Sequence, residues 1–131
     1  MAETTVKIKN GTGVDDIVPM ASGASISAGD IVRYDADGYL EACVTDTTGT
    51  FVVGVALETY DNTAGDDGDY EVKINSFGIV YIAGSYSRAD IGTKFYASTT
   101  AKILANSGTH AVAATLVEVD AGGGWFNFGL K

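Results

Sequence analysis

The stretch Tyr70–Ala83, YEVKINSFGIVYIA, lies at the middle of the 131-residue chain and decides how its strands are organised. Its first half alternates apolar and polar residues, which predicts a strand with one dry and one wet face. Its second half, residues 79–83, is almost wholly apolar and predicts a strand buried on both faces. Two strands joined or bent at Gly78 are therefore expected. The dry face of the first strand is predicted to carry Tyr70, Val72 and Ile74, and the wet face Glu71, Lys73 and Asn75.

The composition predicts a single all-β domain. Hydrophobic residues make up 46% of the chain, and there are 17 glycines but only 1 proline. This mixture is too apolar for a disordered chain and too rich in glycine for a helical bundle. Many short strands with tight turns, and at most one short helix, fit it best.

Residues 58–71 form a strongly acidic segment directly before the second half of the chain. Within these fourteen residues lie six acidic side chains and no lysine or arginine, namely Glu58, Asp61, Asp66, Asp67, Asp69 and Glu71. The formal net charge of the whole chain is -9. Nucleic-acid binding rests mainly on clustered Lys and Arg, so no nucleic-acid partner is expected. The acidic segment is interpreted as a solvated loop, because its spacing does not match an EF-hand calcium loop.

Residues 1–25 are predicted to form an extended N-terminal arm, and residues 26–131 a single β-barrel domain. Residues 4–9, TTVKIK, alternate strictly and predict a half-buried strand, and Asn10-Gly11 then supplies a favoured turn. Residues 11–25 are small, polar and irregular, with Pro19 among them. The arm is expected to drape over the domain or to become ordered on a partner.

The domain shows a weak internal repeat. Gly29, Val32 and Leu40 each lie sixty-three positions before Gly92, Phe95 and Ile103. The strand FVVGVALE at 51–58 then corresponds to HAVAATLVEVD, and DYEVKI corresponds to GGGWFNFGL. Two such halves around one core predict a small antiparallel β-barrel that is closed or nearly closed.

Two strands of this barrel carry specific expectations. Residues 51–57 are apolar on both faces, which predicts a strand inside the core, with a bulge or a close backbone approach at Gly54. In the last strand, Phe126, Phe128 and Leu130 share one face that closes the core. Trp125 then lies on the outer face or in a contact between chains.

No catalytic constellation stands out, and the chain is not expected to be an enzyme. The single histidine, His110, has Ser107 nearby, but no strand-to-helix nucleophile motif accompanies them. Cys43 is the only cysteine and is predicted to be a small buried hydrophobe. No catalytic residue, cofactor or metal ligand is assigned. No signal-peptide or membrane-spanning stretch is recognised, so no membrane partner and synthesis in a host cytoplasm are expected.

With the repeat in view, one series of motifs resembles the small decoration, or capsid cement, proteins of tailed bacteriophages. The motifs are A-G-D-x-V near Ala28, G-V-A at Gly54–Ala56, the glycine-bearing central stretch, and a second opening at Gly92–Tyr96. The resemblance covers residues from about Ile26 to the C-terminus. It implies a small β-barrel of the β-tulip or β-clip type, often trimeric, that binds the outer capsid surface and stabilises the shell.

The resemblance also implies partners and a location. The partners are the major capsid protein and two further copies of the chain in a homotrimer, and the location is the outer surface of the virion. We expect the arm to add a strand to, or drape over, an adjacent subunit while its lysines meet an acidic capsid surface. The expected capsid or subunit contacts are Val6, Lys7, Ile8, Lys9, Tyr86, Arg88 and Trp125.

Two alternative functions remain open. One is a calcium- or carbohydrate-binding β-module, in which the acidic loop holds an ion and Tyr39, Tyr60 or Tyr86 stacks on a sugar ring. The other is a different virion component, such as a neck or head-fibre base protein, built on the same barrel.

Overall fold

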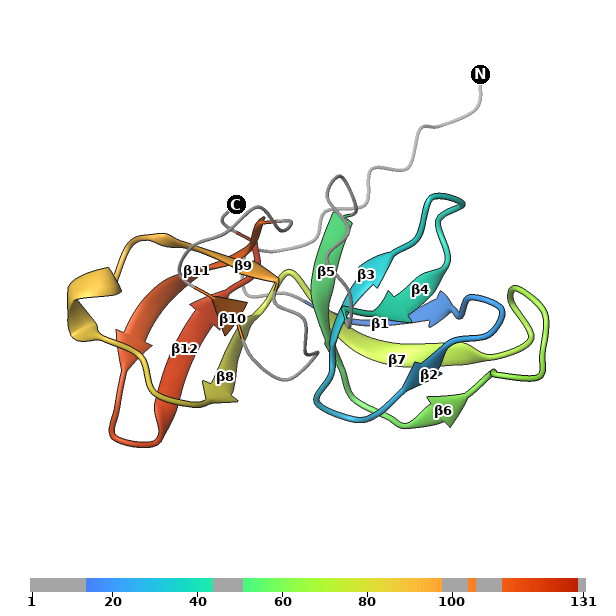
Figure 1. Cartoon of the computed structure of the whole chain (residues 1–131), viewed down its shortest axis with the longest axis horizontal. Coiled ribbons are helices and arrows are strands. Elements are labelled where there is room, and N and C mark those ends of the chain that lie inside the picture. Colours follow the sequence, from blue (N-terminus) through green and yellow to red (C-terminus); the bar gives the residue numbers. More distant parts are fainter. Residues whose placement is uncertain (1–13, 44–50, 98–103, 106–111, 130–131) are drawn as a thin grey trace, which may run out of the picture.

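A computed structural model of the chain describes residues 14–43, 51–97, 104–105 and 112–129, and it confirms the all-β class (Figure 1). Apart from one short 3-10 helix, η1 (Arg88–Asp90), the regular elements of this described part are strands. The strands are β1 (Val14–Pro19), β2 (Ser25–Ile26), β3 (Ile31–Tyr34), β4 (Leu40–Ala42), β5 (Phe51–Ala56), β6 (Tyr60–Asp61), β7 (Glu71–Ser76), β8 (Ile79–Ala83), β9 (Lys94–Ala97), β10 (Leu104–Ala105), β11 (Val112–Val119) and β12 (Gly123–Asn127).

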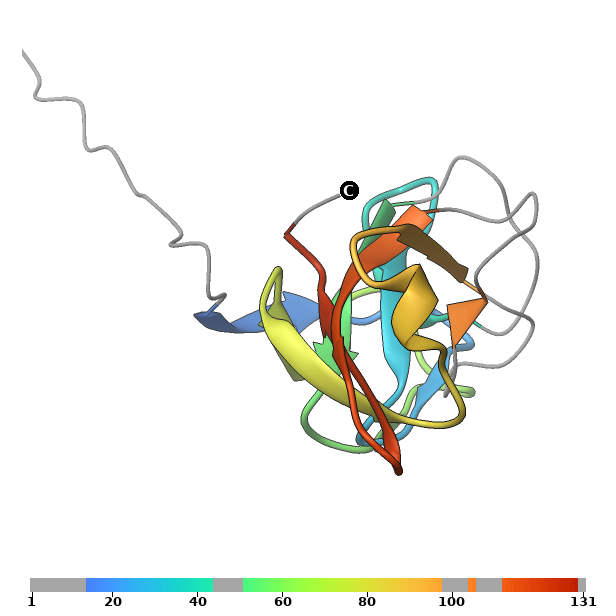
Figure 2. The ribbon, with the colours of Figure 1, turned by 90° about the vertical axis from the view of Figure 1, so that its left-hand side faces the viewer.

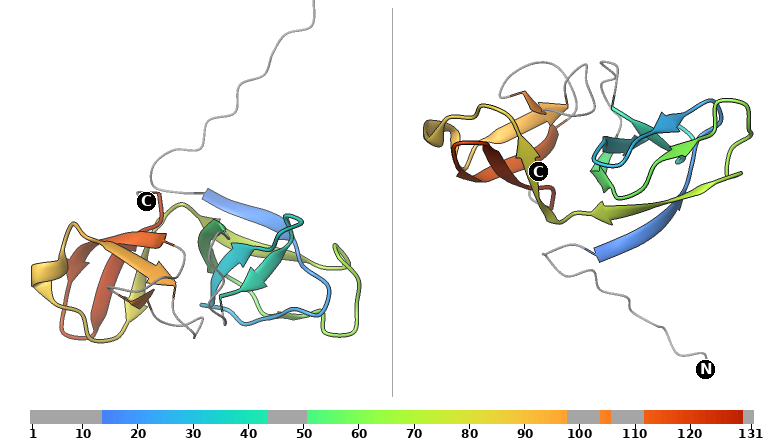
Figure 3. Two further views of the ribbon diagram at one scale, coloured as in Figure 1. Left: turned by 45° about the horizontal axis from the view of Figure 1, so that its top comes forward. Right: turned by 90° about the horizontal axis from the view of Figure 1, so that it is seen from below.

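The strands form two five-stranded antiparallel sheets and a small two-stranded one. The first sheet has the order β1-β7-β5-β3-β4, the second has the order β10-β9-β11-β12-β8, and β2 pairs with β6. The two large sheets lie side by side and are joined where β7 passes into β8 (Figures 1 and 3). Among the described residues the end strands β8 and β10 of the second sheet each pair with one strand only, whereas Met20, directly after β1, forms a parallel bridge with Leu40 of β4 and links the two ends of the first sheet. The predicted closure into one barrel is therefore not observed, because each half of the chain pairs its strands within itself.

The central stretch behaves as predicted in its first half and differently in its second. Val72 and Ile74 of β7 are fully buried whereas Glu71 and Lys73 are exposed, which confirms the dry and wet faces for these residues. Tyr70, predicted to share the dry face, is 46% exposed instead, because it lies before β7 and its ring packs against that of Tyr60. The chain bends at Phe77–Gly78, where Phe77 has a φ of 61°, and β8 begins in the other sheet. The prediction that residues 79–83 are buried on both faces is wrong. Only Ile82 is buried, because among the described residues β8 pairs with β12 alone and its outer face is left exposed.

The internal repeat is confirmed by the strand order. Read from β8, the second sheet runs β8-β12-β11-β9-β10, which matches β1-β7-β5-β3-β4 strand for strand. β3 and β9 occupy positions sixty-three residues apart, as the sequence predicts. Both halves also carry a β-bulge at the matching place. Val53 is the extra residue opposite β3, and Ala113 is the extra residue opposite β9.

The turns that open the two halves share their hydrogen bonds as well as their spacing. The amide of Gly29 donates to the carbonyl oxygen of Ala56 at 2.8 Å, and the amide of Gly92 donates to that of Leu116 at 2.7 Å. The φ angles of these glycines are 89° and 90°, a region that favours glycine over other residues. The glycines that revealed the repeat are thus required by the same backbone geometry in each half.

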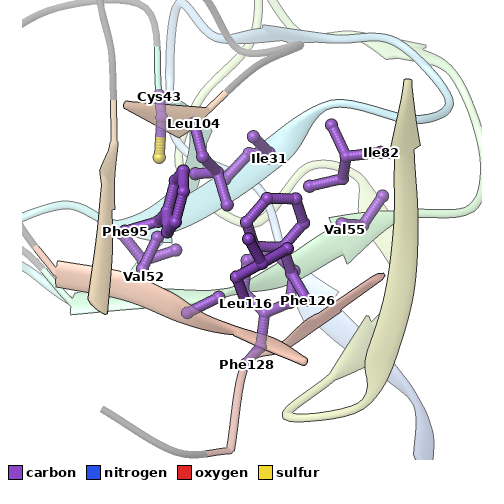
Figure 4. Close-up of a cluster of buried hydrophobic side chains, with 12 residues drawn as sticks. Ile31, Cys43, Val52, Val55, Ile82, Phe95, Leu104, Leu116, Phe126 and Phe128 are labelled. Carbon is purple, nitrogen blue, oxygen red and sulfur yellow. The ribbon is translucent and has the colours of Figure 1, made fainter. Parts of the chain in front are cut away.

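The apolar residues form two clusters. The first cluster lies between the large sheets and takes residues from both, with Phe95, Phe126 and Phe128 of the second half pointing toward Val52 and Val55 of the first (Figure 4). The second cluster lies on the other face of the first sheet and includes Val32, Val53 and Ile74. The core strand prediction for β5 is confirmed, since Val52 and Val53 are each 1% exposed. Its ends are not buried, because Phe51 and Leu57 are 49% and 43% exposed.

The described part of the predicted arm needs a correction. Residues 14–25 were expected to be irregular, yet they contain β1 and β2, and β1 pairs with β7 over its whole length. Val18 and Met20 are buried, because they continue the dry face of β7, and Ala21 is buried where its amide donates to the carbonyl oxygen of Leu40. Pro19 is accommodated since β1 is the last described strand of its sheet. The predicted strand at 4–9 lies outside the described residues.

Candidate functional site

The expected contact residues do not all lie together. Val6, Lys7, Ile8 and Lys9 lie outside the described residues. Tyr86 and Arg88 lie in the segment between β8 and β9, and Trp125 lies on β12. Of these three, Trp125 belongs to an exposed apolar surface, Arg88 lies in an ion pair, and Tyr86 packs into the core.

Trp125 is the centre of an exposed apolar surface on the second sheet. Its side chain is 42% exposed, and it lies directly opposite Tyr81 of β8, with ring centroids 5.1 Å apart and planes at 61°. Ile79 lies two residues earlier on the same face of β8 and is 45% exposed. Figure 2 shows β8, in yellow, beside β12, in red. We call Ile79, Tyr81 and Trp125 the aromatic face.

Sequence reasoning missed two members of the aromatic face. Ile79 and Tyr81 were assigned to a fully buried strand, because the run from 79 to 83 is apolar throughout. Strand alternation places them opposite to Ile82, which is buried in the first cluster. The run itself does not distinguish an internal strand from an end strand. The prediction that Trp125 faces outward was the one available signal. A residue paired with an outward-facing tryptophan on the next strand lies on the same face, and here that residue is Tyr81.

A hydrogen-bonded network fixes the ring of Tyr81. Its hydroxyl donates to Asp120 Oδ1 at 2.9 Å, and the same oxygen accepts from the amides of Gly122 and Gly123 at 2.8 and 2.9 Å. The Gly122 amide and the Tyr81 hydroxyl hold the pKa of Asp120 below its ordinary value, while the bond to Asp120 raises the pKa of Tyr81. The carboxylate therefore stays ionised and keeps the tyrosine ring in place over a wide pH range around neutrality.

An ion pair borders the aromatic face. The Arg88 guanidinium donates to Glu118 Oε1 and, at 3.2 Å, to the carbonyl oxygen of Val119. The Val119 amide and then Arg88 lower the pKa of Glu118. Glu118 lies opposite Trp125 in the register of β11 and β12. Both charged side chains are well exposed, so the pair contributes little to stability and offers polar groups at the edge of an apolar surface.

Tyr86 supports the first cluster. Its ring meets those of Phe95 and Phe126 edge to face, with centroids 5.8 and 4.9 Å away. Burial raises the pKa of its hydroxyl. Tyr86 is therefore a partly buried residue at the border of the first cluster, and only part of its side chain is left exposed for contact with a partner.

The acidic loop is exposed but ordered, and Asn62 holds it in place. The Asn62 side chain is 1% exposed, and its Nδ2 donates to the carbonyl oxygens of Ala21 and Asp66 at 2.9 and 3.0 Å. Its main chain bonds to Gly23 and Ala24. Ser22 adds a bond from its amide to Asp67 and one from its hydroxyl to the Gly65 carbonyl oxygen. The loop is thus docked onto residues 20–24.

Replacing Asn62 by alanine should loosen this loop. The carbonyl oxygens of Ala21 and Asp66 would each lose a hydrogen-bond donor. The bond to Ala21 is buried, and leaving a buried acceptor without its donor costs about 1–3 kcal/mol. We expect a fall of that size in the free energy of unfolding, measured by urea denaturation, and faster proteolysis between residues 61 and 69. The matched control is Thr63→Ala, an exposed neighbour that should change stability by less than about 0.5 kcal/mol. An Asn62 variant as stable as wild type would contradict the docking role.

The acidic loop does not assemble a carboxylate cluster in the described residues. No group of three or more His, Cys, Asp or Glu side chains is placed to hold a metal ion within the part of the chain that the structure describes. An open hollow is lined by residues including Asp61, Gly65, Asp69 and Tyr70. Tyr60 lies against Tyr70, with centroids 6.0 Å apart, and neither Tyr39 nor Tyr86 lines the hollow.

Cys43 is buried as predicted. It is 0% exposed in the first cluster, and burial raises the pKa of its thiol to about 12. A thiol with such a pKa is almost entirely protonated at neutral pH and is a poor nucleophile. His110 and Ser107 lie outside the described residues.

Comparison with known proteins found no matching protein-family model, no matching curated protein and no matching solved structure. In the described residues no helix is both long and apolar enough to cross a membrane.

Proposed function

We propose that this chain is a structural virion protein of a tailed bacteriophage that binds the outer surface of the capsid and stabilises the shell. The observation that carries the proposal is the aromatic face, Ile79, Tyr81 and Trp125, displayed on a duplicated β-scaffold. The sequence motifs that resemble phage decoration proteins support the same reading. The partner is the major capsid protein, and the assembled form is a homotrimer on the outside of the virion.

The geometry suits attachment to a surface. Tyrosine and tryptophan are the residues most often responsible for binding energy at protein interfaces, and here they are pre-ordered by Asp120 and by each other. The ion pair Arg88–Glu118 supplies a polar border. Each copy needs to contribute only a modest contact energy, because many copies bound to one shell stabilise it together by mass action.

The test is co-sedimentation with expanded capsids that lack the protein. Truncating both rings in the double variant Tyr81→Ala/Trp125→Ala should weaken binding about 30- to 700-fold, as expected for two interface residues worth about 1–2 kcal/mol each. Deleting residues 2–12 should abolish attachment if the arm also contacts the shell. Leu57→Ala is the matched control, since Leu57 is 43% exposed outside the aromatic face.

Undiminished co-sedimentation of the double variant would contradict the role of the aromatic face. Binding to isolated neck or fibre assemblies, with no binding to capsids, would instead support the neck or head-fibre base alternative.

A calcium-binding role is the second candidate, and one observation favours it. Asn62 Oδ1 is buried and has no hydrogen-bond partner among the described residues. It faces the same side of Gly65 as Asp69 Oδ2, which accepts from the Asp66 amide at 2.8 Å. Calcium prefers such oxygen ligands, although it needs six to eight of them. A melting temperature that rises when calcium is added would favour calcium binding. An unchanged melting temperature would contradict calcium binding and favour the capsid role.

A further inference from the structure

The main chain of β8 has a side that β12 does not use. The amide of Phe128 donates to the carbonyl oxygen of Gly78 at 2.9 Å, and the amide of Gly84 donates to that of Gly122 at 3.1 Å. Because antiparallel strands exchange hydrogen bonds at every second residue, these two bonds fix the alternation along β8. The residues whose main-chain groups point away from β12 are therefore Ile79, Tyr81 and Ala83. Among the described residues no strand pairs with β8 on that side.

This edge of β8 offers hydrogen-bonding groups to an added strand. Each of the three outward-pointing residues has one amide donor and one carbonyl acceptor. Proteins commonly protect such an edge with a charged residue, a proline or a bulge. The strand Ile79–Ala83 carries neither charge nor proline, and its pairing with β12 runs without a shift in register. Nothing in β8 itself therefore opposes the addition of a strand.

The inner side of this edge is apolar. Ile82 is 7% exposed in the first cluster, and Val80 packs against the same cluster. Side chains of neighbouring strands align across a sheet, so an added strand would continue this face. Its inward-pointing residues therefore need to be apolar, because they would lie next to Val80 and Ile82.

The outer side of this edge favours a cation. Tyr81 lies there beside Trp125, and its hydroxyl is bonded to the Asp120 carboxylate. A lysine or arginine on an added strand would meet this carboxylate and two aromatic rings, and both attract cations. An acidic residue would be repelled by Asp120 and by a chain of net charge -9. A second copy of β8 is a poor occupant, since β8 brings no cation.

We propose that β8 accepts an extended segment of a partner protein as an additional strand of the second sheet, and that this segment alternates apolar residues with lysine or arginine. The apolar residues cover Val80 and Ile82, and the basic side chains lie on the aromatic face beside Asp120. The strand addition supplies main-chain hydrogen bonds that the aromatic face alone does not. Only the identity of the partner as the major capsid protein rests on the proposed function.

The first test uses the isolated protein and a synthetic peptide, Thr-Val-Lys-Val-Lys-Val-Thr with blocked ends. With this peptide in excess, hydrogen exchange followed by NMR should become several-fold slower at the amides of Tyr81 and Ala83. The amides of Val80 and Ile82 face β12 and serve as the internal reference, with no change expected. The control peptide carries glutamate in place of both lysines and should leave all four rates unchanged.

The second test removes one edge donor and keeps the aromatic face. In Ala83→Pro the outward-pointing amide is lost and the proline ring obstructs a neighbouring strand, while no bond to β12 is broken. Co-sedimentation with expanded capsids should weaken about tenfold or more. Ala83→Ser is the matched control, because it keeps the amide and should bind as the wild type does. Circular dichroism checks that both variants fold.

The two tests separate this inference from the proposed function. Unchanged exchange with the lysine peptide would overturn the strand addition, even if capsids bind the protein through its aromatic face. Slowed exchange with the peptide and no binding to capsids would support the strand addition and overturn the capsid role. Equal effects of the two peptides would overturn the preference for a basic strand. Exchange that slows in the isolated protein as its concentration rises would show that a second copy occupies the edge instead.

Discussion

Replacing Phe126 by alanine should lower the free energy of unfolding by about 3–5 kcal/mol, the range for a large core aromatic truncated to alanine. Phe126 is 0% exposed, and its ring meets those of Tyr86 and Phe95 edge to face at 4.9 and 5.0 Å. The cavity would open in the cluster between the two large sheets, where residues of both halves meet. Urea denaturation of the purified variant measures the loss.

The next residue along the strand provides the control for Phe126. Trp125→Ala removes a larger side chain from the opposite, exposed face of β12, so it leaves no cavity in the core. We expect it to cost less than about 1.5 kcal/mol, mostly from the lost contact with Tyr81. If both variants lost the same stability, the assignment of the inner and outer faces of β12 would be wrong.

Gly54→Ala should prevent folding or cost more than about 4 kcal/mol, which is exceptional for the addition of one methyl group. A Cβ at this position would lie 2.0 Å from the main-chain oxygen of Asn75 and 3.2 Å from Ser76 Cα, and main-chain atoms of β7 cannot move without breaking the β5–β7 ladder. Circular dichroism and the yield of soluble protein report the outcome.

The repeat supplies a matched control for Gly54. Ala114 occupies the equivalent register position in the second half, opposite Phe95, and it carries a Cβ in a fully buried site. Ala114→Gly should therefore fold and lose only about 1 kcal/mol or somewhat more. A well-folded Gly54→Ala variant would contradict the close contact between Gly54 and the main chain of Asn75.

The sequence was most informative at positions where the backbone geometry requires one particular residue type. The sixty-three-residue spacing of Gly29 and Gly92 predicted the repeat, because positive φ in both turns demands glycine. The alternation of β7 predicted the two faces of its residues 71–74. Gly54 predicted a bulge or a close backbone approach, and the structure shows the close approach, to Asn75 of β7.

Sequence reasoning failed where the answer depended on which strands become neighbours. The apolar run of β8 predicted full burial, but burial of a strand depends on what covers each face, and only its inner face is covered. Residues 14–19 contain Asp15, Asp16 and Pro19 and were read as irregular. They form β1 because they pair with β7 and Val18 extends its buried apolar face. This pairing depends on tertiary contacts, which a local sequence pattern does not contain.

The uncharged composition of β8 has a consequence for handling the protein. β1 carries two aspartates and a proline at the end of its sheet, whereas Ile79–Ala83 has neither charge nor proline and ends the other sheet. End strands of this kind are sites of edge-to-edge aggregation. In free molecules the formal charge of -9 opposes such association by mutual repulsion. Added salt screens that repulsion, so concentrated stocks should remain clear at low ionic strength and become turbid as salt is raised.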